Sequence, residues 1–141
     1  MSVAALPQTL VGEEIHFPDG LPGFAEARRF RLGDLGAELA PFLELVCLDP
    51  GPRFVVVPPG ALWPAYTLEL ADDVAAAMDV HHEADAAILA IVTLHPGPEA
   101  PTVNLMAPLV VNVRTAVASQ VVLQPHEAPS ACPVTSASPL G

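Results

Sequence analysis

The stretch APTVNLMAPLVVNVRTAVASQVVL, residues 100–123, decides the fold, because it contains three short apolar runs separated by turn residues. Runs of this length that are rich in Val and Leu predict strands, here at residues 102–106, 109–114 and 120–123. Side chains alternate between the two faces of a strand. The alternation predicts that three polar residues point away from the apolar core: Asn104, Asn112 and Gln120.

The same pattern extends over the rest of the chain. Its 17 prolines divide it into short pieces that are rich in Val, Leu, Ile or Phe rather than in helix formers. These pieces predict further strands at residues 14–17, 29–32, 43–48, 53–58, 66–70 and 87–94. The last of these runs is apolar on both faces, as is typical of a central strand covered on one side by a helix. The sequence therefore predicts a mostly β fold, a small antiparallel β-barrel-like or sandwich domain.

One segment, LADDVAAAMDVHHEAD at residues 70–85, departs from the strand pattern. Its alanines favour a helix, and Asp72 or Asp73 can cap the N-terminus of that helix. Val74, Ala77 and Met78 then fall on one helical face. We expect one short helix here, packed against the sheet.

The chain of 141 residues suits a single domain, which we place at residues 1–124. Residues 125–141 are rich in Pro, Ser and Ala and have no apolar periodicity, so we predict a flexible tail. The chain has no Lys or Arg before Arg28 to form the basic start of a signal peptide, and its apolar runs are too short to span a membrane. We expect a cytoplasmic protein with no membrane contact, in which Cys47 and Cys132 form no disulfide.

Charge is the most skewed property of the sequence. Sixteen acidic residues against five basic ones, all arginines, give a formal net charge of -11. Because nucleic acids are bound chiefly through cations that neutralise phosphates, we expect no direct nucleic-acid binding. The negative charge either keeps an apolar chain soluble or steers basic proteins towards it, and the sequence leaves both possibilities open.

Residues that could carry chemistry are scattered. The run HHEAD includes His81 and His82, but adjacent histidines on a strand point to opposite faces, and no further ligand pair completes a metal site. Cys47 lies in an apolar strand, so we predict that its thiol is buried in the core and unreactive. A nucleophile elbow and a phosphate loop are both missing. We therefore predict no catalytic residue, no metal and no cofactor.

Six segments in order resemble the motif series of the bacterial flagellar assembly factor FliW family. They are FPDGLPGF, PFLELVCLDPGPRFVVVPP, PAYTLEL, AILAIVTL, TVNLMAPLVVN and SQVVL, which together cover about residues 15–123. The first segment also predicts a rigid loop that closes one end of a barrel. Two places differ from the family pattern: its usual Leu-Gln-Ser is Leu45, Val46 and Cys47 here, and its tyrosine and basic residues after the last strand are missing.

The resemblance implies a non-enzymatic protein of bacterial flagellum biogenesis and translation regulation, which acts as a chaperone-like binding partner of flagellin and of the RNA-binding repressor CsrA. The residues we expect to contact partners are Tyr66, Asp72, Asp73, Asn104, Asn112 and Gln120. Two other functions stay open: a β-barrel that binds a small ligand among its polar strand residues, and a hydrolase or metalloenzyme around His81 and His82.

Overall fold

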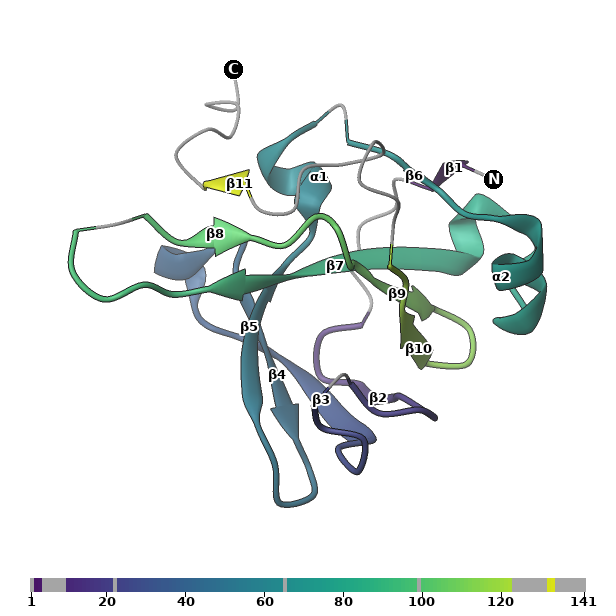
Figure 1. The fold of residues 1–141 in the computed structure, drawn as a ribbon, viewed down its shortest axis with the longest axis horizontal. Helices are drawn as coiled ribbons and strands as arrows, with labels where there is room; N and C mark the ends of the chain where they lie inside the picture. Colours follow the sequence, from purple (N-terminus) through teal and green to yellow (C-terminus); the bar gives the residue numbers. More distant parts are fainter. Residues whose placement is uncertain are drawn as a thin grey trace.

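The computed structural model describes residues 2–3, 10–21, 23–64, 66–98, 100–122 and 132–133. These residues form short strands joined by turns, with two short α-helices (Figure 1). The strands are β1 (Ser2–Val3), β2 (Glu14–His16), β3 (Arg29–Asp34), β4 (Leu43–Cys47), β5 (Arg53–Val57), β6 (Leu68–Glu69), β7 (Ala86–Thr93), β8 (Thr102–Val103), β9 (Leu109–Asn112), β10 (Val117–Gln120) and β11 (Cys132–Pro133). The helices are α1 (Pro59–Leu62) and α2 (Asp72–Ala77), with 3-10 turns η1 (Ala37–Leu39) and η2 (Glu83–Asp85). Within these ranges, no helix is long and apolar enough to cross a membrane.

Seven strands close into a barrel in the order β7, β5, β4, β3, β2, β10 and β9, because β9 pairs back with β7. Neighbouring strands are antiparallel except β2 and β10, which meet in parallel at one residue pair, His16 with Val117. Closure of this kind leaves no free edge among the barrel strands. The predicted mostly β, barrel-like fold is confirmed.

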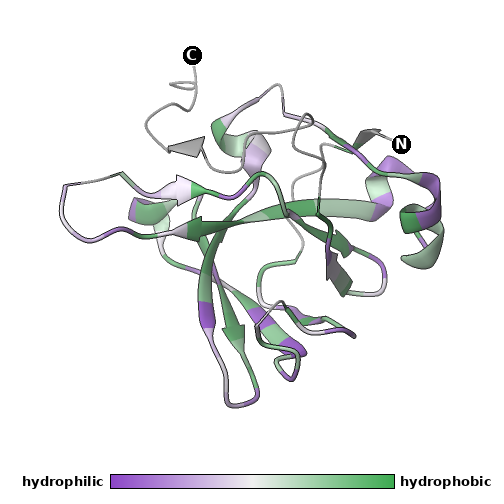
Figure 2. Cartoon of the chain, in the orientation of Figure 1, coloured by the Kyte–Doolittle hydropathy of each residue, from purple (hydrophilic) through white to green (hydrophobic). Residues whose placement is uncertain are grey.

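Strand β7 holds the barrel together. It pairs with β5 along one edge, and along the other edge it pairs first with β9 and then with β8. Six of its eight side chains are buried, Ile91 is half-buried and Thr93 is exposed. The strand is therefore coloured hydrophobic along most of its length in Figure 2. The prediction of a central strand that is apolar on both faces is confirmed.

The interior of the barrel is filled by side chains from every barrel strand or the loops beside them. Phe30, Leu32 and Leu45 are fully buried there, and Leu89 and Leu109 meet them from the other side of the barrel. Burial of side chains of this size gives about 1.5–3 kcal/mol each. The interior is therefore a packed core rather than a ligand chamber.

A second apolar layer covers the outer face of β7 and β9. Val3 of β1, Leu68 of β6 and Ala75 of α2 pack there against Ile88 and Val110. Around α1, Leu62 packs against a further group that includes β5 and β7 residues on the same outer face. The barrel wall formed by β5, β7 and β9 is thus apolar on both sides.

This second layer encloses a polar residue that the sequence predicted to point away from the inner core. Asn112 does point outward, because Leu109 and Val111 face the inner core, but it is fully buried, as are its three neighbours in β9. The outer face of β9 is covered by the α2 layer, so a polar residue there is enclosed. Alternation along a strand identifies its two faces, but it does not tell which face meets solvent.

Three predicted strands differ most from those in the structure. The strand expected at 120–123 lies instead at Val117–Gln120, and β8 ends at Val103 because Asn104 begins a turn. The prediction that Gln120 points away from the core is wrong, because Gln120 pairs with Leu109 and shares a strand face with Ala118 of the inner core. The strand expected at 66–70 is reduced to Leu68–Glu69. Cys47 in β4 is half-buried at the border of the inner core rather than fully buried.

Helix α2 forms where expected, with two corrections. Its N-cap is Ala71, and neither Asp72 nor Asp73 caps it; both carboxylates lie exposed in the first turn, where they favour the positive end of the helix. Its packed face contains Ala75, together with half-buried Val74 and Met78, while Ala77 is exposed. The helix is one turn and a half long, so its inward face is set by where the chain enters from β6 rather than by a full helical period.

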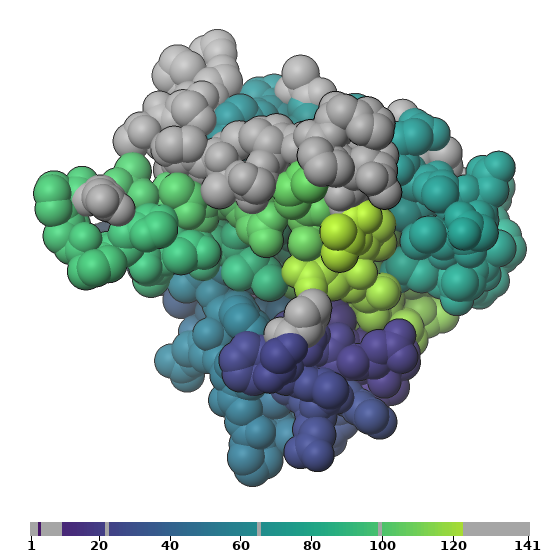
Figure 3. Space-filling view, in the orientation of Figure 1, coloured from purple at the N-terminus to yellow at the C-terminus, as the bar shows by residue number. Residues whose placement is uncertain are grey.

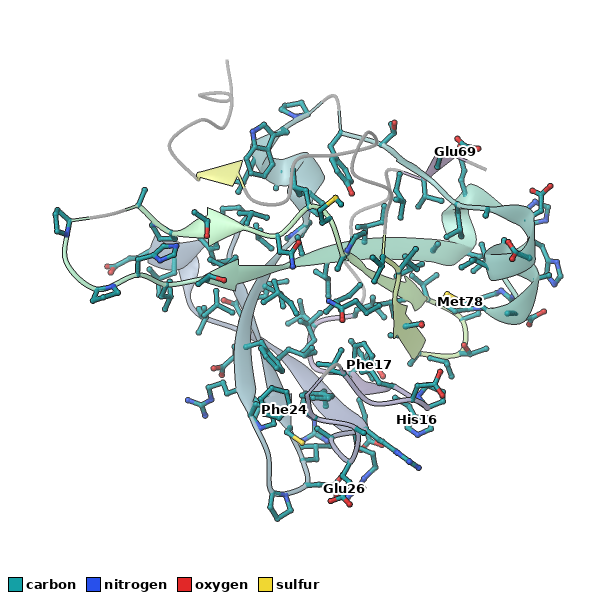
Figure 4. The ribbon with its side chains drawn as sticks, in the orientation of Figure 1. His16, Phe17, Phe24, Glu26, Glu69 and Met78 are labelled. Carbon is teal, nitrogen blue, oxygen red and sulfur yellow. The ribbon has the colours of Figure 1, made fainter. Side chains whose placement is uncertain are left out.

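The loop FPDGLPGF lies at one end of the barrel, as predicted. Phe17 stacks edge-on against Phe30 with ring centroids 5.4 Å apart, and Phe24 stacks similarly on Phe54 at 6.0 Å (Figure 4). Between them, the N–H of Gly20 donates to the Phe17 carbonyl oxygen. Phe17 therefore anchors one end of the loop to the core, and Phe24, which is 45% exposed, holds the other end against half-buried Phe54 at the surface.

Replacing Gly20 by Ala should destabilise the protein by about 2–5 kcal/mol, since a positive φ and a forced clash each cost about 1–3 kcal/mol. Gly20 has a φ of +66°, and a Cβ placed there would lie 2.5 Å from the Ala25 carbonyl oxygen. Gly23 is the matched control, because its φ is +82° but its Cβ would meet no atom within 4 Å. Gly23→Ala should cost only about 1–2 kcal/mol. Chemical denaturation measures both, and equal losses would contradict the close approach.

The tail predicted at residues 125–141 lies mostly outside the described residues. Two of its residues, Cys132–Pro133, form β11 and pair with β8. Truncation after Pro125 removes only this short pairing from the described structure, so we expect the thermal midpoint to fall by less than about 8 °C. Calorimetry of the truncated chain measures this shift, and a larger fall would mean that the tail is part of the folded domain.

Candidate protein-binding site

Two residues expected to contact partners, Asn104 and Gln120, hold the same turn. Asn104 Oδ1 accepts hydrogen bonds from the N–H groups of Met106 (3.0 Å) and Ala107 (3.3 Å). Gln120 Nε2 donates to the Ala107 carbonyl oxygen at 3.0 Å. Both side chains are half-buried, and their amides stabilise the connection from β8 to β9.

Tyr66 lies between the two outer apolar clusters and packs against both. Its hydroxyl is buried and makes no hydrogen bond within the described structure, and the same holds for Gln120 Oε1. Burial raises the pKa of the Tyr66 hydroxyl above its ordinary value. The ring sits within the outer layer rather than at its rim, so the hydroxyl does not reach water.

Asn112 joins the end of α2 to the hairpin between β9 and β10. Its Nδ2 donates to the carbonyl oxygens of Met78 (2.8 Å) and Asp79 (3.1 Å), and its Oδ1 accepts from the N–H groups of Arg114 (2.9 Å) and Thr115 (3.2 Å). Met78 is labelled beside this hairpin in Figure 4. Every donor and acceptor of the buried amide is therefore used, as burial requires.

Arg114 completes this connection from the other side. Its Nε donates to Asp85 Oδ1 at 3.1 Å, and its Nη2 donates to the Asp79 carbonyl oxygen at 2.6 Å. Sequence reasoning missed both contacts, because the residues lie 29 and 35 positions apart and belong to no recognisable motif. We call Asp79, Asp85, Asn112 and Arg114 the clasp.

Asp85 is the buried carboxylate of the clasp. Its Oδ2 accepts hydrogen bonds from the backbone N–H groups of His81 (3.0 Å) and His82 (3.1 Å). The His81 N–H is the main cause that holds the pKa of Asp85 below its ordinary value, with Arg114 adding to it against the effect of burial. Asp79, which contacts His81 Nε2 at 2.7 Å, also has a lowered pKa, chiefly because of that contact.

The acidic segment from α2 to η2 therefore divides into two sets. Asp79 and Asp85 belong to the clasp, although Asp79 is itself exposed, whereas Asp72, Asp73 and Glu83 are exposed and lie outside the clasp. In the space-filling view, α2 and its neighbours project at the right of the molecule (Figure 3). Together with Asp79, these three carboxylates give the segment its negative surface.

Metal ligands do not converge in the part of the chain that the structure describes. No group of three or more His, Cys, Asp or Glu side chains lies close enough there to hold an ion. His81 contacts Asp79, whereas the neighbouring His82 offers its backbone to Asp85. In this arrangement the HHEAD run closes a turn around the Asp85 carboxylate.

Replacing Asp85 by Asn should lower the thermal midpoint by several degrees at pH 7, because Arg114 and two backbone N–H groups lose a charged acceptor. A carboxylate with a lowered folded pKa stabilises above its unfolded pKa of about 3.9, and that stability is lost as pH falls through the folded pKa. The difference in thermal midpoint between wild type and Asp85→Asn should therefore become smaller from pH 7 to pH 3. Thermal melts over that range measure it.

The matched control for this experiment is Asp72→Asn, which removes an exposed carboxylate of the same segment. It should change the midpoint by little at any pH, because exposed charges contribute little to stability. A gap between wild type and Asp85→Asn that stayed constant down to pH 3 would contradict the role of the ionised carboxylate.

The fold and these contacts define a small closed β-barrel with a packed interior, whose polar candidate residues mostly hold its own backbone. The profile of a protein family described as FliW protein matches residues 6–134 of this chain. The chain belongs to the FliW family of flagellar assembly factors.

Individual relatives agree with the family match. The chain is 32% identical over 122 residues to the flagellar assembly factor FliW of Oceanobacillus iheyensis, covering 86% of this chain and 83% of that protein. It is 37% identical to the FliW of Syntrophus aciditrophicus, over 78% of this chain and 70% of that protein. A crystal structure of a flagellar assembly factor FliW superposes with a TM-score of 0.75 at 30% identity, covering 86% of this chain and 84% of that one. The predicted family resemblance is confirmed.

Proposed function

We propose that this protein binds flagellin and the translational repressor CsrA in the cytoplasm, and that it relieves CsrA-mediated repression of flagellin synthesis when free flagellin is scarce. The observation that carries the proposal is membership of the FliW family over residues 6–134. In this role the protein is a binding partner and not an enzyme. Its activity is the exchange of one protein partner for another.

The packed barrel supports a protein-binding role over the small-ligand alternative. A barrel that holds a ligand needs an interior cavity with a few polar groups. Here the interior is occupied by buried Phe, Leu, Ile and Val side chains. The polar residues that suggested a ligand mouth, Asn104 and Gln120, instead bind the backbone of one turn.

The net charge supports CsrA as the partner that electrostatic attraction draws to this protein. A chain with a formal net charge of -11 attracts a basic RNA-binding protein over distances of several ångströms. Among the residues expected to contact partners, Asp72 and Asp73 are exposed in α2, and they remain the candidates for this contact. Asn104, Asn112 and Gln120 act by shaping the surface on which contacts form.

The direct test is co-purification. Tagged protein should capture flagellin and CsrA of the same bacterium as separate complexes, and adding flagellin should release CsrA. Binding of neither purified protein at micromolar concentration would overturn the proposal.

Raising salt from about 50 to 300 mM shortens the Debye length from roughly 14 to 6 Å. Association with CsrA should slow several-fold over this range, since complementary charge acts mainly on the encounter rate. Flagellin binding should change less, because the family resemblance implies that flagellin is recognised through an amphipathic helical segment, which is held by apolar contact. Stopped-flow measurements at both salt concentrations give the two rates.

The variant Asp72→Asn, Asp73→Asn, Glu83→Gln separates the acidic segment from the net charge. It should slow association with CsrA at low salt, while leaving the clasp intact. The control Glu13→Gln, Asp19→Asn, Glu26→Gln removes three exposed carboxylates elsewhere and the same amount of charge. Equal rates for both variants would remove the acidic segment from the CsrA contact and leave net charge alone as the cause.

A further inference from the structure

An apolar groove interrupts the outer layer of the barrel beside β5 and β7. Its volume is about 270 Å³, and its lining offers no polar surface. We call it the η1 groove; its lining residues are Leu35, Leu39, Phe42, Val55, Val92, Leu94 and Pro101. In Figure 1, η1 lies near the hairpin that joins β7 to β8, at the left of the barrel.

The groove is a continuation of the apolar outer wall. Val55 and Val92 form its floor and are direct partners in the pairing of β5 with β7. Further along the same wall, α1 and α2 cover the neighbouring outer side chains of β7. At the η1 end that cover is incomplete, and Leu39 and Leu94 are 53% and 64% exposed. Large exposed apolar side chains grouped over an apolar floor indicate an interaction surface.

The pairing of the strands around the groove limits what can occupy it. β5 and β7 are paired along both edges, and the outer edge of β8 is paired with β11. An extended peptide needs a free strand edge to satisfy its backbone, and the described strands beside the groove offer none. Strand addition is therefore not available at this groove, whereas an α-helix suits it, because a helix satisfies its own backbone hydrogen bonds.

The charges beside the groove indicate what flanks the apolar face of that helix. Asp34 and Glu38 directly precede the lining residues Leu35 and Leu39, and both acids are exposed. Across the β4–β5 pair, Glu44 Oε2 lies 3.6 Å from Arg53 Nε, so the positive charge of Arg53 is partly neutralised. A helix that carries Lys or Arg beside its apolar stripe would match this rim.

We propose that the η1 groove is the docking site for an amphipathic α-helix of a partner protein, with aliphatic side chains in the groove and basic side chains against Asp34 and Glu38. The inference deepens the proposed function and rests on it for the partner's identity. Of the two proposed partners, flagellin is the one held through an amphipathic helical segment. The exposed acids of α2 would then serve a separate contact.

The first test uses a designed helical peptide with Leu at positions i, i+3, i+4 and i+7 and Lys beside them. The variant Leu39→Ser, Leu94→Ser removes the two most exposed apolar side chains that line the groove, and it should weaken binding of this peptide at least tenfold. The control Val11→Ser, Val122→Ser removes two exposed apolar side chains elsewhere, which are 43% and 73% exposed, and should bind as the wild type does. Titration calorimetry gives the affinities, and thermal melts establish that each variant is folded.

A version of the peptide with Glu in place of Lys should bind the wild type several-fold more weakly. Neither peptide binding the wild type, or equal loss in both Ser variants, would overturn the groove as a helix site. If the wild type instead forms a concentration-dependent dimer that Leu39→Ser, Leu94→Ser abolishes, the occupant is a second copy of this chain and the proposal is wrong.

Repeating the titrations with purified flagellin separates this inference from the proposed function. Flagellin binding to the wild type that falls at least tenfold in Leu39→Ser, Leu94→Ser supports both. Flagellin binding that is equal in wild type and variant leaves the proposed function in place and removes the groove from it. Absence of flagellin binding to the wild type contradicts the proposed function, whereas the designed peptides still decide whether the groove accepts a helix.

Discussion

The pairing of β7 on both edges is the constraint on which the rest of the structure depends. One edge of this strand meets β5, and the other meets β9 and then β8, so the barrel closes through it. Because both of its faces are apolar, β7 also joins two layers: the packed interior and the outer cover. A barrel wall that is apolar on both sides needs a second layer outside it.

That need explains the roles of the short elements. Helices α1 and α2 and the small sheet of β1 with β6 are too short to be stable alone, and they gain their stability from packing on the outer wall. The clasp then fixes the end of α2 to the hairpin after β9, through the buried amide of Asn112 and the ion pair of Arg114 with Asp85. Polar residues that look like surface contacts in the sequence are used to hold this layer in place.

The same construction leaves two kinds of surface, which we propose as the contacts for partners. The exposed carboxylates of α2 and η2 form an acidic segment whose charge attracts a partner at a distance, and the η1 groove is an apolar opening that can bind only on contact. Under the proposed function, two surfaces that differ in this way let each partner be recognised by a different force. Membership of the FliW family gives the biological setting, flagellar assembly.

The sequence by itself determined the features that depend on near neighbours. Proline and glycine spacing, together with the apolar runs, predicted most strands, the helix at α2 and the loop at residues 17–24, because turn chemistry and strand alternation act within a few residues. The motif order also predicted the family. Only the tertiary structure decided that Asn112 is buried, that Asp85 pairs with Arg114, and that Leu39 and Leu94 line the same groove. Those outcomes depend on contacts between residues tens of positions apart, and the alternation along one strand carries no information about what covers its outer face.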